Sequence, residues 1–494
     1  MTRVIVETLV VLLVTPYVVH KLGQARYGLW ALAGVLTVYV RLLDFGVARS
    51  LIKYVAEFHA RKGSAEINHL VNTAALLYVM MGVSLVGLVW WLRWPLIVYV
   101  FRVPEALQPE ALAIFVGVTV VSVLRLVSGV FESVLDGLQR MELTSATSVL
   151  DRTLSAVGSV IALQLGFGLP GLVVKNAVVA VVVGILNLLL IRRLLSTLVL
   201  SPRFFSVASA GRLFRFGANF QIVNLMVFLI DPFNKWLLGR AVSIESVGYY
   251  EIATQVVARV VVLFRAVADA IYPAVSELQA LLGHLSLSRV YRRATRHLAT
   301  ISLPAFTLMV VLSDALIDLW LGPGYPDVVR ALRILGMARL VSITATPALF
   351  IAQGFGRPDL GMYAMVASGI LNLTVSSLLV PRMGFDGVIY ANALAIASGS
   401  LLMFVFFHHA FRIRPTELVN AIGTKAFLLN LGLAMALVSV RALAQTLSLL
   451  LLAVHVGVYL VAYSIGLLLV GYFDADDRRL VVQMLPDRLT KHLS

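Results

Sequence analysis

Stretches of about twenty consecutive apolar residues recur along the whole length of this 494-residue chain. A helix of ~20 residues is long enough to cross the ~30 Å hydrocarbon core of a bilayer. Only 13% of the residues are charged, whereas a soluble domain is about 25% charged. Because a chain in lipid must satisfy its own backbone hydrogen bonds, these stretches are expected to be helical. We therefore predict an all-α polytopic membrane protein of about 14 transmembrane helices.

The predicted spans cover residues 4–22, 28–46, 67–91, 110–134, 143–166, 169–191, 214–238, 248–273, 297–319, 330–352, 360–381, 386–409, 424–445 and 447–471. An even number of spans places both termini on one side of the membrane. Most of the 40 Lys and Arg residues lie in the loops on that side, which the positive-inside rule identifies as cytoplasmic. The net charge of +15 thus reflects topology rather than a nucleic-acid partner. We predict a multi-pass protein of the cell (inner or plasma) membrane, in contact with membrane lipids, with cytoplasmic termini.

The chain also contains an internal repeat. Gly387 and Asn392 stand 216 residues after Gly171 and Asn176, and a similar offset of 217 relates GLQR (137–140) to GFGR (354–357). After a four-residue insertion, the offset of 220 pairs Gly28 with Gly248. Several matches in order at one nearly constant offset indicate a duplication. The offset of 216 also pairs Met1 with Gly217, inside the seventh span, so the first span is expected to be short.

The repeat predicts four segments. Residues 1–200 and 213–415 form two six-helix lobes, 424–471 add two transmembrane helices, and 472–494 form a cytoplasmic tail. Each lobe has an even number of spans, so both insert with the same orientation. Parallel repeats of this kind are related by an axis along the membrane normal, and transporters built from such repeats bind substrate between them. The arrangement predicts a transporter whose lobes rock about a central cavity, although duplication alone could also produce it.

Charged residues inside the predicted spans are the first candidates for a binding site. Each costs about 2.5–3.5 kcal/mol near the bilayer centre, so it is expected to face a cavity or a partner. They are Arg41, Asp44, Arg125, Glu132, Lys175, Arg259, Arg265, Asp269 and Arg339. Arg41 and Arg265 have acids three and four residues away, so each can form a structural pair on its own helix.

Arg259 has no acid three or four positions away, and it lies near the predicted midplane. A guanidinium there needs an anion or water, and arginine suits bidentate phosphate binding. The excess of basic residues predicts a cationic lumen and an anionic substrate, with Arg41, Arg125, Lys175, Arg259 and Arg265 as contacts. The amides Asn176 and Asn392, at matched positions of the repeat, are further binding candidates. Their structural alternative is interhelical hydrogen bonding.

Several kinds of chemistry are missing from the sequence. It contains no phosphate-binding Gly-x-x-x-x-Gly-Lys-[Ser/Thr] loop, no His-Glu-x-x-His metal helix, no Gly-x-Ser-x-Gly elbow and no cysteine. No predicted loop exceeds about twenty residues, which leaves little room for a catalytic domain. We therefore predict no cofactor, no metal and no catalytic residues, and favour transport over catalysis.

Several motifs together resemble one superfamily. They are LVTPYVVHKLGQARYGLWAL (13–32), LLDFGVARSLIKYVAEFHARKG (42–63), GLQR (137–140), LGFGLPGL (165–172), AIYPAVSEL (270–278) and DLWLGPGY (318–325). The chain resembles the Wzx-type polysaccharide and O-antigen flippases of the multidrug/oligosaccharidyl-lipid/polysaccharide (MOP) exporter superfamily. That superfamily also holds lipid II flippases and multidrug and toxin extrusion (MATE) transporters. The motifs are short and none is catalytic, so they are more specific for the superfamily than for the substrate.

The resemblance implies movement of an undecaprenyl-pyrophosphate-linked oligosaccharide from the inner to the outer leaflet, with a proton or sodium ion as a possible coupling ion. In lipid II flippases, arginines on the first, second and eighth helices line the cavity. Arg41 matches the second helix, and Arg259 or Arg265 matches the eighth. The first helix departs from the pattern, because it has only Arg3 near its end.

Two alternatives remain open at the level of the sequence. A MATE-like exporter of cationic drugs would have an acidic cavity, and this chain has no Asp on its first helix. A membrane polysaccharide polymerase or glycosyltransferase would need a long outer loop or a soluble domain. The excess of intramembrane basic residues and the short loops favour the flippase.

Overall fold

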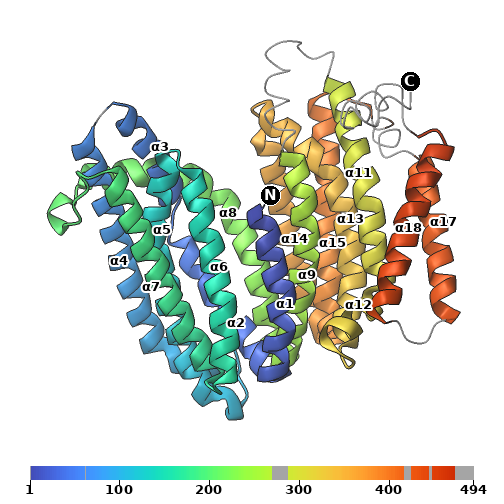
Figure 1. Cartoon of the computed structure of the whole chain (residues 1–494), viewed down its shortest axis with the longest axis horizontal. Helices are drawn as coiled ribbons and strands as arrows, with labels where there is room; N and C mark the ends of the chain where they lie inside the picture. Colours follow the sequence, from blue (N-terminus) through green and yellow to red (C-terminus); the bar gives the residue numbers. More distant parts are fainter. Residues whose placement is uncertain are drawn as a thin grey trace. The chain divides into compact units, whose positions relative to one another are not determined.

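A computed structural model describes residues 2–61, 63–269, 287–414, 416, 424–443 and 448–472. Every regular element in these ranges is a helix (Figure 1). The α-helices are α1 (Thr2–Leu22), α2 (Gln24–Leu42), α3 (Val47–Ala60), α4 (Ser64–Pro95), α5 (Gln108–Gly137), α6 (Met141–Gln164), α7 (Gly168–Leu194), α8 (Val207–Ala241), α9 (Ile244–Asp269), α11 (Leu287–Val311), α12 (Ser313–Leu321), α13 (Pro326–Gly354), α14 (Pro358–Met383), α15 (Phe385–Ala410), α17 (Thr424–Leu443) and α18 (Leu449–Leu469). Short π and 3-10 helices cover Leu96–Val100, Glu105–Leu107 and Pro202–Phe204.

The predicted fold class is confirmed. Each of the fourteen predicted spans overlaps a helix of at least 19 residues. Among the described residues, eleven helices are long and apolar enough to span a membrane, or twelve if the bent pair α2 and α3 counts as one span. That pair bends by 43°. Large apolar side chains are exposed on most of these helices, among them Val83, Val174 and Leu378, as expected of surfaces that face lipid.

The repeat is visible in two matched turns. The turn from α5 to α6 places Gln139 at φ 60°, and the turn from α13 to α14 places Gly356 at φ 73°. In the first turn, the Arg140 N–H donates to the carbonyl of Leu135 at 3.0 Å. In the second turn, the N–H of Arg357 donates to the carbonyl five residues earlier at 2.8 Å. Each arginine also pairs with the acid two residues later. The two turns thus share one geometry at the offset predicted from the sequence.

The helices form two compact units. The first contains Met1–Gln255 and Met365–Asn392, and the second contains Val256–Ala364 and Ala393–Ser494. Packing defines these units, and their ranges differ from those of the two lobes that the repeat predicts. The division into lobes and tail therefore stays a prediction.

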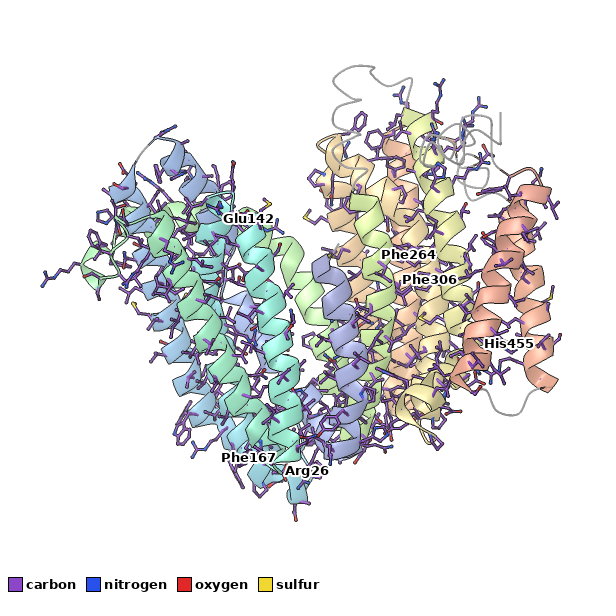
Figure 2. The ribbon with its side chains drawn as sticks, in the orientation of Figure 1. Arg26, Glu142, Phe167, Phe264, Phe306 and His455 are labelled. Atoms are coloured by element: carbon purple, nitrogen blue, oxygen red, sulfur yellow. The ribbon has the colours of Figure 1, made fainter. Side chains whose placement is uncertain are left out.

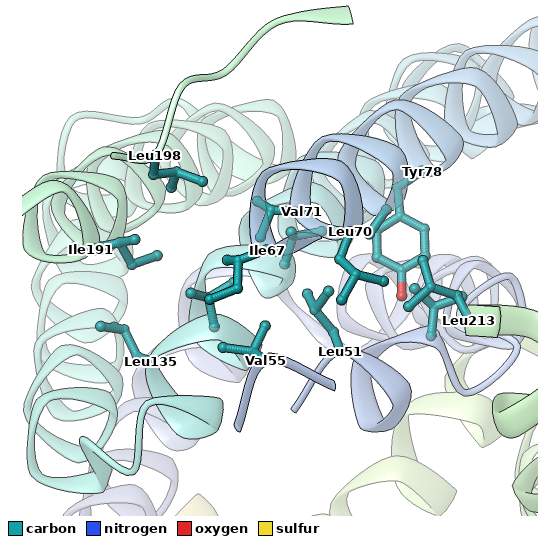
Figure 3. Close-up of a cluster of buried hydrophobic side chains, with 14 residues drawn as sticks. Leu51, Val55, Ile67, Leu70, Val71, Tyr78, Leu135, Ile191, Leu198 and Leu213 are labelled. Atoms are coloured by element: carbon teal, nitrogen blue, oxygen red, sulfur yellow. The ribbon is translucent and has the colours of Figure 1, made fainter. Parts of the chain in front are cut away.

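The core of the first unit lies between α3, α4, α5 and α7. Figure 3 shows its buried side chains, including Val55, Ile67, Leu70, Leu135 and Ile191. All five are at most 3% exposed. Their burial stabilises the bundle by packing rather than by transfer from water, because lipid is as apolar as they are. Three of these helices, α4, α5 and α7, also line the polar cavity described below.

A close helix crossing joins α2 to α9 in the same unit. A Cβ atom added to Gly28 would lie 1.9 Å from the carbonyl oxygen of Ile244, and one added to Gly248 would lie 3.3 Å from the Cα atom of Gly28. Only glycine lets the two backbones approach this closely. The two glycines that the repeat pairs therefore contact each other.

Two asparagines of α4 hold the linker between α7 and α8. The Asn68 side chain donates to the carbonyl of Thr197 at 2.9 Å and accepts from the N–H of Val199 at 2.8 Å. The Asn72 side chain donates to the carbonyl of Val199 at 2.8 Å and accepts from the N–H of Ser201 at 2.7 Å. Hydrogen bonds from these two side chains to the linker backbone thus hold the linker against α4 of the first repeat.

The second unit has its own core. Tyr291 of α11 packs against Phe407 of α15 with ring centroids 4.9 Å apart, and Phe264 of α9 lies 5.8 Å from Phe306 of α11 (Figure 2). The additional helix α17 is attached by polar contacts. Its Arg441 side chain donates two hydrogen bonds to the carboxylate of Asp314, at 2.7 and 2.8 Å.

Candidate functional site

A polar cavity lies inside the first unit, among the helices of the N-terminal repeat. Its volume is about 400 Å³. The wall is formed by α2, the start of α3, α4, α5, α6 and α7, together with the turn that joins α2 to α3. A polar cavity at membrane depth is expected to be functional, because lipid would exclude the same side chains.

Charged side chains of both signs line this cavity. The basic residues are Arg41, Arg125 and Arg152, and the acidic residues are Asp44, Glu132 and Asp151. Of the predicted contacts, Arg41 and Arg125 are therefore brought together. The lining of this cavity is charge-balanced, which differs from the strongly basic surface that the sequence predicted for the lumen. Sequence reasoning missed Asp151 and Arg152, which lie in the predicted fifth span.

Arg125 pairs across the cavity wall with Asp151. One Nη atom of Arg125 on α5 lies 3.2 Å from both carboxylate oxygens of Asp151 on α6. The Asp151 side chain is 13% exposed and that of Arg125 is 36% exposed. Glu132, two turns along the same helix, also lines the cavity. A helix places only residues three or four apart in contact, so an adjacent helix supplies the closer acid.

Arg41 and Asp44 line the same cavity without pairing with each other. The Asp44 carboxylate accepts a short hydrogen bond from the Tyr78 hydroxyl and another from the backbone N–H of Ala48, at 3.0 Å. Among the described residues, no ion pair joins Arg41 to an acid. The expected helical pair therefore does not form, because α2 ends before Asp44 and the chain turns there.

Uncharged groups complete the lining. The Ser122 hydroxyl donates to the hydroxyl of Thr37 at 2.9 Å, which joins α5 to α2. Asn187 of α7 is 3% exposed, and its Oδ1 atom accepts no hydrogen bond from the described part of the chain. An unsatisfied buried amide oxygen is costly, so this atom offers an acceptor to a polar guest in the cavity.

The other predicted contacts lie outside this lining. Lys175 of α7 donates from Nζ to the carbonyl of Ser155 at 2.9 Å, and Asn176 is half-buried beside it. Arg259 of α9 belongs to the second unit, where it is half-buried and interacts with its surroundings. The side chain of Arg265 lies outside the described residues.

Asn392 belongs to a buried hydrogen-bond network in the first unit. The side-chain amides of Asn392 on α15 and Asn234 on α8 donate to the Tyr250 hydroxyl of α9, at 2.9 and 3.1 Å. Ser376 of α14 donates to Oδ1 of Asn234 at 3.2 Å. Asn372, one turn earlier, is 0% exposed and has no partner for either amide atom among the described residues. In the structure, Asn392 takes the interhelical role.

An ion triad around the buried Lys235 joins α8 to α9, and sequence reasoning missed it. The ammonium of Lys235 is 2.6 Å from Oδ2 of Asp231 and 2.6 Å from Oε2 of Glu251. The Lys235 side chain is 9% exposed. Asp231 and Lys235 are four residues apart, which is the spacing of a helical ion pair and could have revealed them. The triad thus surrounds one buried ammonium with two carboxylates, of which that of Glu251 is 18% exposed and that of Asp231 is 40% exposed.

Comparisons with known proteins agree with this architecture. Residues 22–330 match the model of the family described as "Polysaccharide biosynthesis protein". The chain is 24% identical over 429 residues to the probable flippase AglR of Haloferax volcanii, covering 85% of this chain and 84% of that protein. It is 24% identical over 197 residues to the probable low-salt glycan biosynthesis flippase Agl15 of the same organism, covering 40% and 42% of the two chains.

Solved structures share the fold at low identity. The lipid II flippase MurJ in an inward closed conformation matches with a TM-score of 0.74 and 11% identity, covering 94% of this chain and 96% of that one. An inward-facing multidrug resistance MATE family transporter matches with a TM-score of 0.72 and 16% identity, covering 82% and 94%. The family match covers more than half of the chain. The protein is therefore a multi-pass membrane protein that belongs to the polysaccharide biosynthesis protein family.

Proposed function

We propose that this protein is a flippase that moves a polyprenyl-pyrophosphate-linked oligosaccharide, of the undecaprenyl type, from the inner to the outer leaflet. The observation that carries the proposal is the convergence of Arg41, Arg125 and Arg152 on one cavity at membrane depth. Within the part of the chain that the structure describes, Arg41 has no carboxylate partner, so its guanidinium is available to a phosphate, which it can bind through two parallel hydrogen bonds. The names of the flippase relatives support the same class of substrate.

Within this proposal, the residues of the cavity have separate roles. Arg41 binds the pyrophosphate, while Asp151 holds the guanidinium of Arg125 at the cavity wall. Polar side chains such as Asn187 accept hydrogen bonds from sugar hydroxyls. The two predicted lobes then rock against each other in alternating access, while the cavity of the N-terminal repeat holds the head group. Arg259, Arg265, Lys175 and Asn176 stay proposed contacts along the path of the head group.

A coupling ion, a proton or sodium, is part of the same proposal. The triad of Asp231, Lys235 and Glu251 has one carboxylate more than it has ammonium groups, and a net negative charge at membrane depth favours a cation. Glu251→Gln is expected to abolish the stimulation of transport by an imposed ion gradient while leaving substrate binding intact. If the variant still responds to the ion gradient like the wild type, the triad takes no part in ion coupling.

Arg41 provides the direct test of substrate class. Purified protein in vesicles is given a fluorescent undecaprenyl-pyrophosphate-oligosaccharide, and the fraction that reaches the opposite leaflet is measured. Removing a charge-assisted hydrogen bond costs about 1.5–3 kcal/mol, so Arg41→Ala is expected to slow translocation about 10- to 100-fold. Arg41→Lys should restore part of the rate, since lysine keeps the charge without the bidentate geometry.

Arg93→Ala is the matched control, because Arg93 lies on α4 outside the cavity lining and binds the Trp90 carbonyl of its own helix. It should translocate at the wild-type rate. Equal loss in Arg41→Ala and Arg93→Ala would contradict a phosphate contact at Arg41. A folded wild type that flips no lipid-linked oligosaccharide would contradict the function itself.

The acids of the cavity favour one alternative function. Asp44, Glu132 and Asp151 line it together with the arginines, and acids are what a MATE-like exporter of cationic drugs needs. The same vesicles loaded with a cationic dye distinguish the two proposals. Export of the dye, without flipping of the lipid, would establish the drug exporter. A polymerase or glycosyltransferase has no observation in its favour.

A further inference from the structure

The helices around the polar cavity keep a constant register, which gives each lining residue a depth along the bundle. Helices α5 and α7 lie side by side (Figure 1). A Cβ atom added to Gly117 of α5 would lie 2.6 Å from Cγ1 of Val173. One added to Gly184 of α7 would lie 2.5 Å from Oγ of Ser128. Both contacts join residues that are 56 positions apart, so α5 and α7 run in the same direction at a fixed offset.

Helix α2 runs parallel to α5 in the same way. Arg26 of α2 forms an ion pair with Glu110 at the start of α5. One and a half turns or more beyond, near the cavity, Thr37 of α2 accepts a hydrogen bond from Ser122 of α5 at 2.9 Å. These two contacts join residues that are 84 and 85 positions apart. The end of α2 can therefore be placed against α5 by the same offset.

These offsets divide the cavity lining into two layers. The offset of 85 places Arg41 level with residue 126, beside Arg125. The offset of 56 places Asn187 level with residue 131, beside Glu132. Arg125 and Glu132 are seven residues apart, or about 10 Å at ~1.5 Å per residue. We call Arg41 and Arg125 the arginine layer, and Glu132 and Asn187, which lie nearer the turn from α5 to α6, the acceptor layer.

The acceptor layer suits a guest that donates hydrogen bonds. Asn187 is 3% exposed, and its Oδ1 atom has no hydrogen-bond partner in the described part of the chain. Glu132 brings a carboxylate to the same level, and a carboxylate accepts hydrogen bonds without donating them. Oxygen acceptors are complementary to O–H and N–H groups, and the carboxylate repels a phosphate. The two layers are therefore complementary to different parts of one head group.

We propose that the acceptor layer binds the sugar attached directly to the pyrophosphate, with Asn187 accepting a hydrogen bond from it; this inference rests on the proposed function. The pyrophosphate occupies the arginine layer, where guanidinium groups suit it. The separation of about 10 Å between the layers matches a pyrophosphate joined to one pyranose ring. The rest of the glycan then points toward the α5–α6 turn, on the predicted cytoplasmic side, where a substrate of the inner leaflet carries its sugars.

Asn187 is then a specificity-determining residue for the first sugar. A ligand without a donor at this position leaves the buried Oδ1 atom unpaired, which a site built around a hydrogen bond penalises. The loss of one such hydrogen bond corresponds to about 2- to 13-fold in affinity. The arginine layer, in contrast, contributes equally to every polyprenyl pyrophosphate, whatever sugar it carries.

The test measures the affinity of short-chain ligands for the purified full-length protein in detergent. The ligands are farnesyl pyrophosphate and its conjugates with glucose, galactose and N-acetylglucosamine. The wild type should bind at least one conjugate more tightly than farnesyl pyrophosphate. Asn187→Leu should weaken that conjugate about 2- to 13-fold and weaken farnesyl pyrophosphate less. Asn187→Asp keeps an acceptor oxygen and should keep the preference for the sugar, although its charge lowers the affinity for both ligands.

Two further variants complete the design. Ser84→Leu is the matched control, because Ser84 is an exposed polar residue of α4 outside the cavity lining that bonds to its own helix. It should bind every ligand like the wild type. Arg41→Ala should weaken farnesyl pyrophosphate and its conjugates by the same factor, since it acts on the pyrophosphate alone.

The outcomes separate this inference from the proposed function. Equal weakening of farnesyl pyrophosphate and the preferred conjugate in Asn187→Leu would make Asn187 a structural residue and overturn the proposal. Unchanged binding of every conjugate in that variant, or loss of the sugar preference in Asn187→Asp, would also overturn it. So would a wild type that binds no conjugate more tightly than farnesyl pyrophosphate. A folded wild type that binds neither farnesyl pyrophosphate nor its conjugates would contradict the proposed function itself.

Discussion

At the scale of single residues, the position of a charged residue within a predicted span was enough to predict some residues of the site. Arg41 and Arg125 lie far enough inside their spans to need a cavity, and both line one. The partner of Arg125 was not predictable, because Asp151 is 26 residues away on another helix and helical spacing identifies only local neighbours. Lys235 was missed because it stands near the end of its predicted span, where a lysine usually snorkels to the interface.

The Arg125–Asp151 pair yields a stability prediction. Asp151→Asn leaves the guanidinium without its counter-charge, and breaking a buried pair costs about 3–5 kcal/mol, which the partial exposure of Arg125 reduces to about 1–3 kcal/mol. The melting temperature of the purified protein in detergent should fall accordingly. Arg125→Met combined with Asp151→Leu should recover most of the loss, since an apolar pair needs no counter-charge. An Asp151→Asn protein as stable as the wild type would show that the pair is not a structural contact.

At the scale of elements, the helices followed from the apolar runs, whereas their crossings did not. The sequence predicted that Gly28 and Gly248 correspond, and it gave no sign that they touch. Contacts between helices distant in the chain depend on tertiary packing, which a hydropathy pattern does not encode. The turns are an intermediate case, because GLQR and GFGR were recognisable as a repeat before their shared left-handed residue was known.

The glycine crossing predicts an asymmetric response to alanine. Gly28→Ala would place a methyl group 1.9 Å from the Ile244 carbonyl oxygen, so α2 or α9 must move, at a cost of about 1–3 kcal/mol. Gly34→Ala, on the same helix, meets nothing within 4 Å and should stabilise by up to about 1 kcal/mol through helix propensity. Thermal unfolding of the two variants measures the difference. Equal melting temperatures would contradict the close approach of α2 and α9.

The matched turns predict opposite effects of exchanging their residues. Gln139 adopts a left-handed conformation that costs a side-chain-bearing residue about 1–2 kcal/mol and costs glycine little. Gln139→Gly should therefore raise the melting temperature, and Gly356→Gln should lower it. A result in which Gln139→Gly destabilises the protein would mean that the glutamine side chain contributes more to this turn than its strain costs.

At the scale of the whole molecule, the helical class and the order of the helices followed from the sequence, and the packing units did not. Helix α8 and the first part of α9, up to Gln255, lie mostly within the predicted second repeat, yet they pack with the first unit. A repeat reflects duplication of the sequence, whereas a compact unit reflects contacts between helices. Helix α8 packs directly against α2 and α3, which belong to the first repeat. The sequence could not distinguish these two divisions because the offset between repeats carries no information about neighbours.

The proposed orientation can be measured directly, since the chain has no native cysteine. Single cysteines at Arg203, in the linker between α7 and α8, and at Glu105, between α4 and α5, occupy exposed positions on opposite sides of the predicted topology. In intact cells, a membrane-impermeant maleimide should label Glu105→Cys and spare Arg203→Cys until the membrane is opened. The reverse pattern would place the termini outside and contradict the positive-inside assignment.

The crossing of α2 and α9 has a consequence for how the chain evolved by duplication. A residue that contacts its own counterpart lies on the axis relating two copies, as in the isologous contact of a twofold dimer. Gly28 and Gly248 stand in this relation. A half-length ancestor of this chain would have met its twin at that one glycine, so a single codon would have governed both sides of the contact. Fusion split that control between two codons, and at Gly28 the Ile244 carbonyl leaves no room for a Cβ atom.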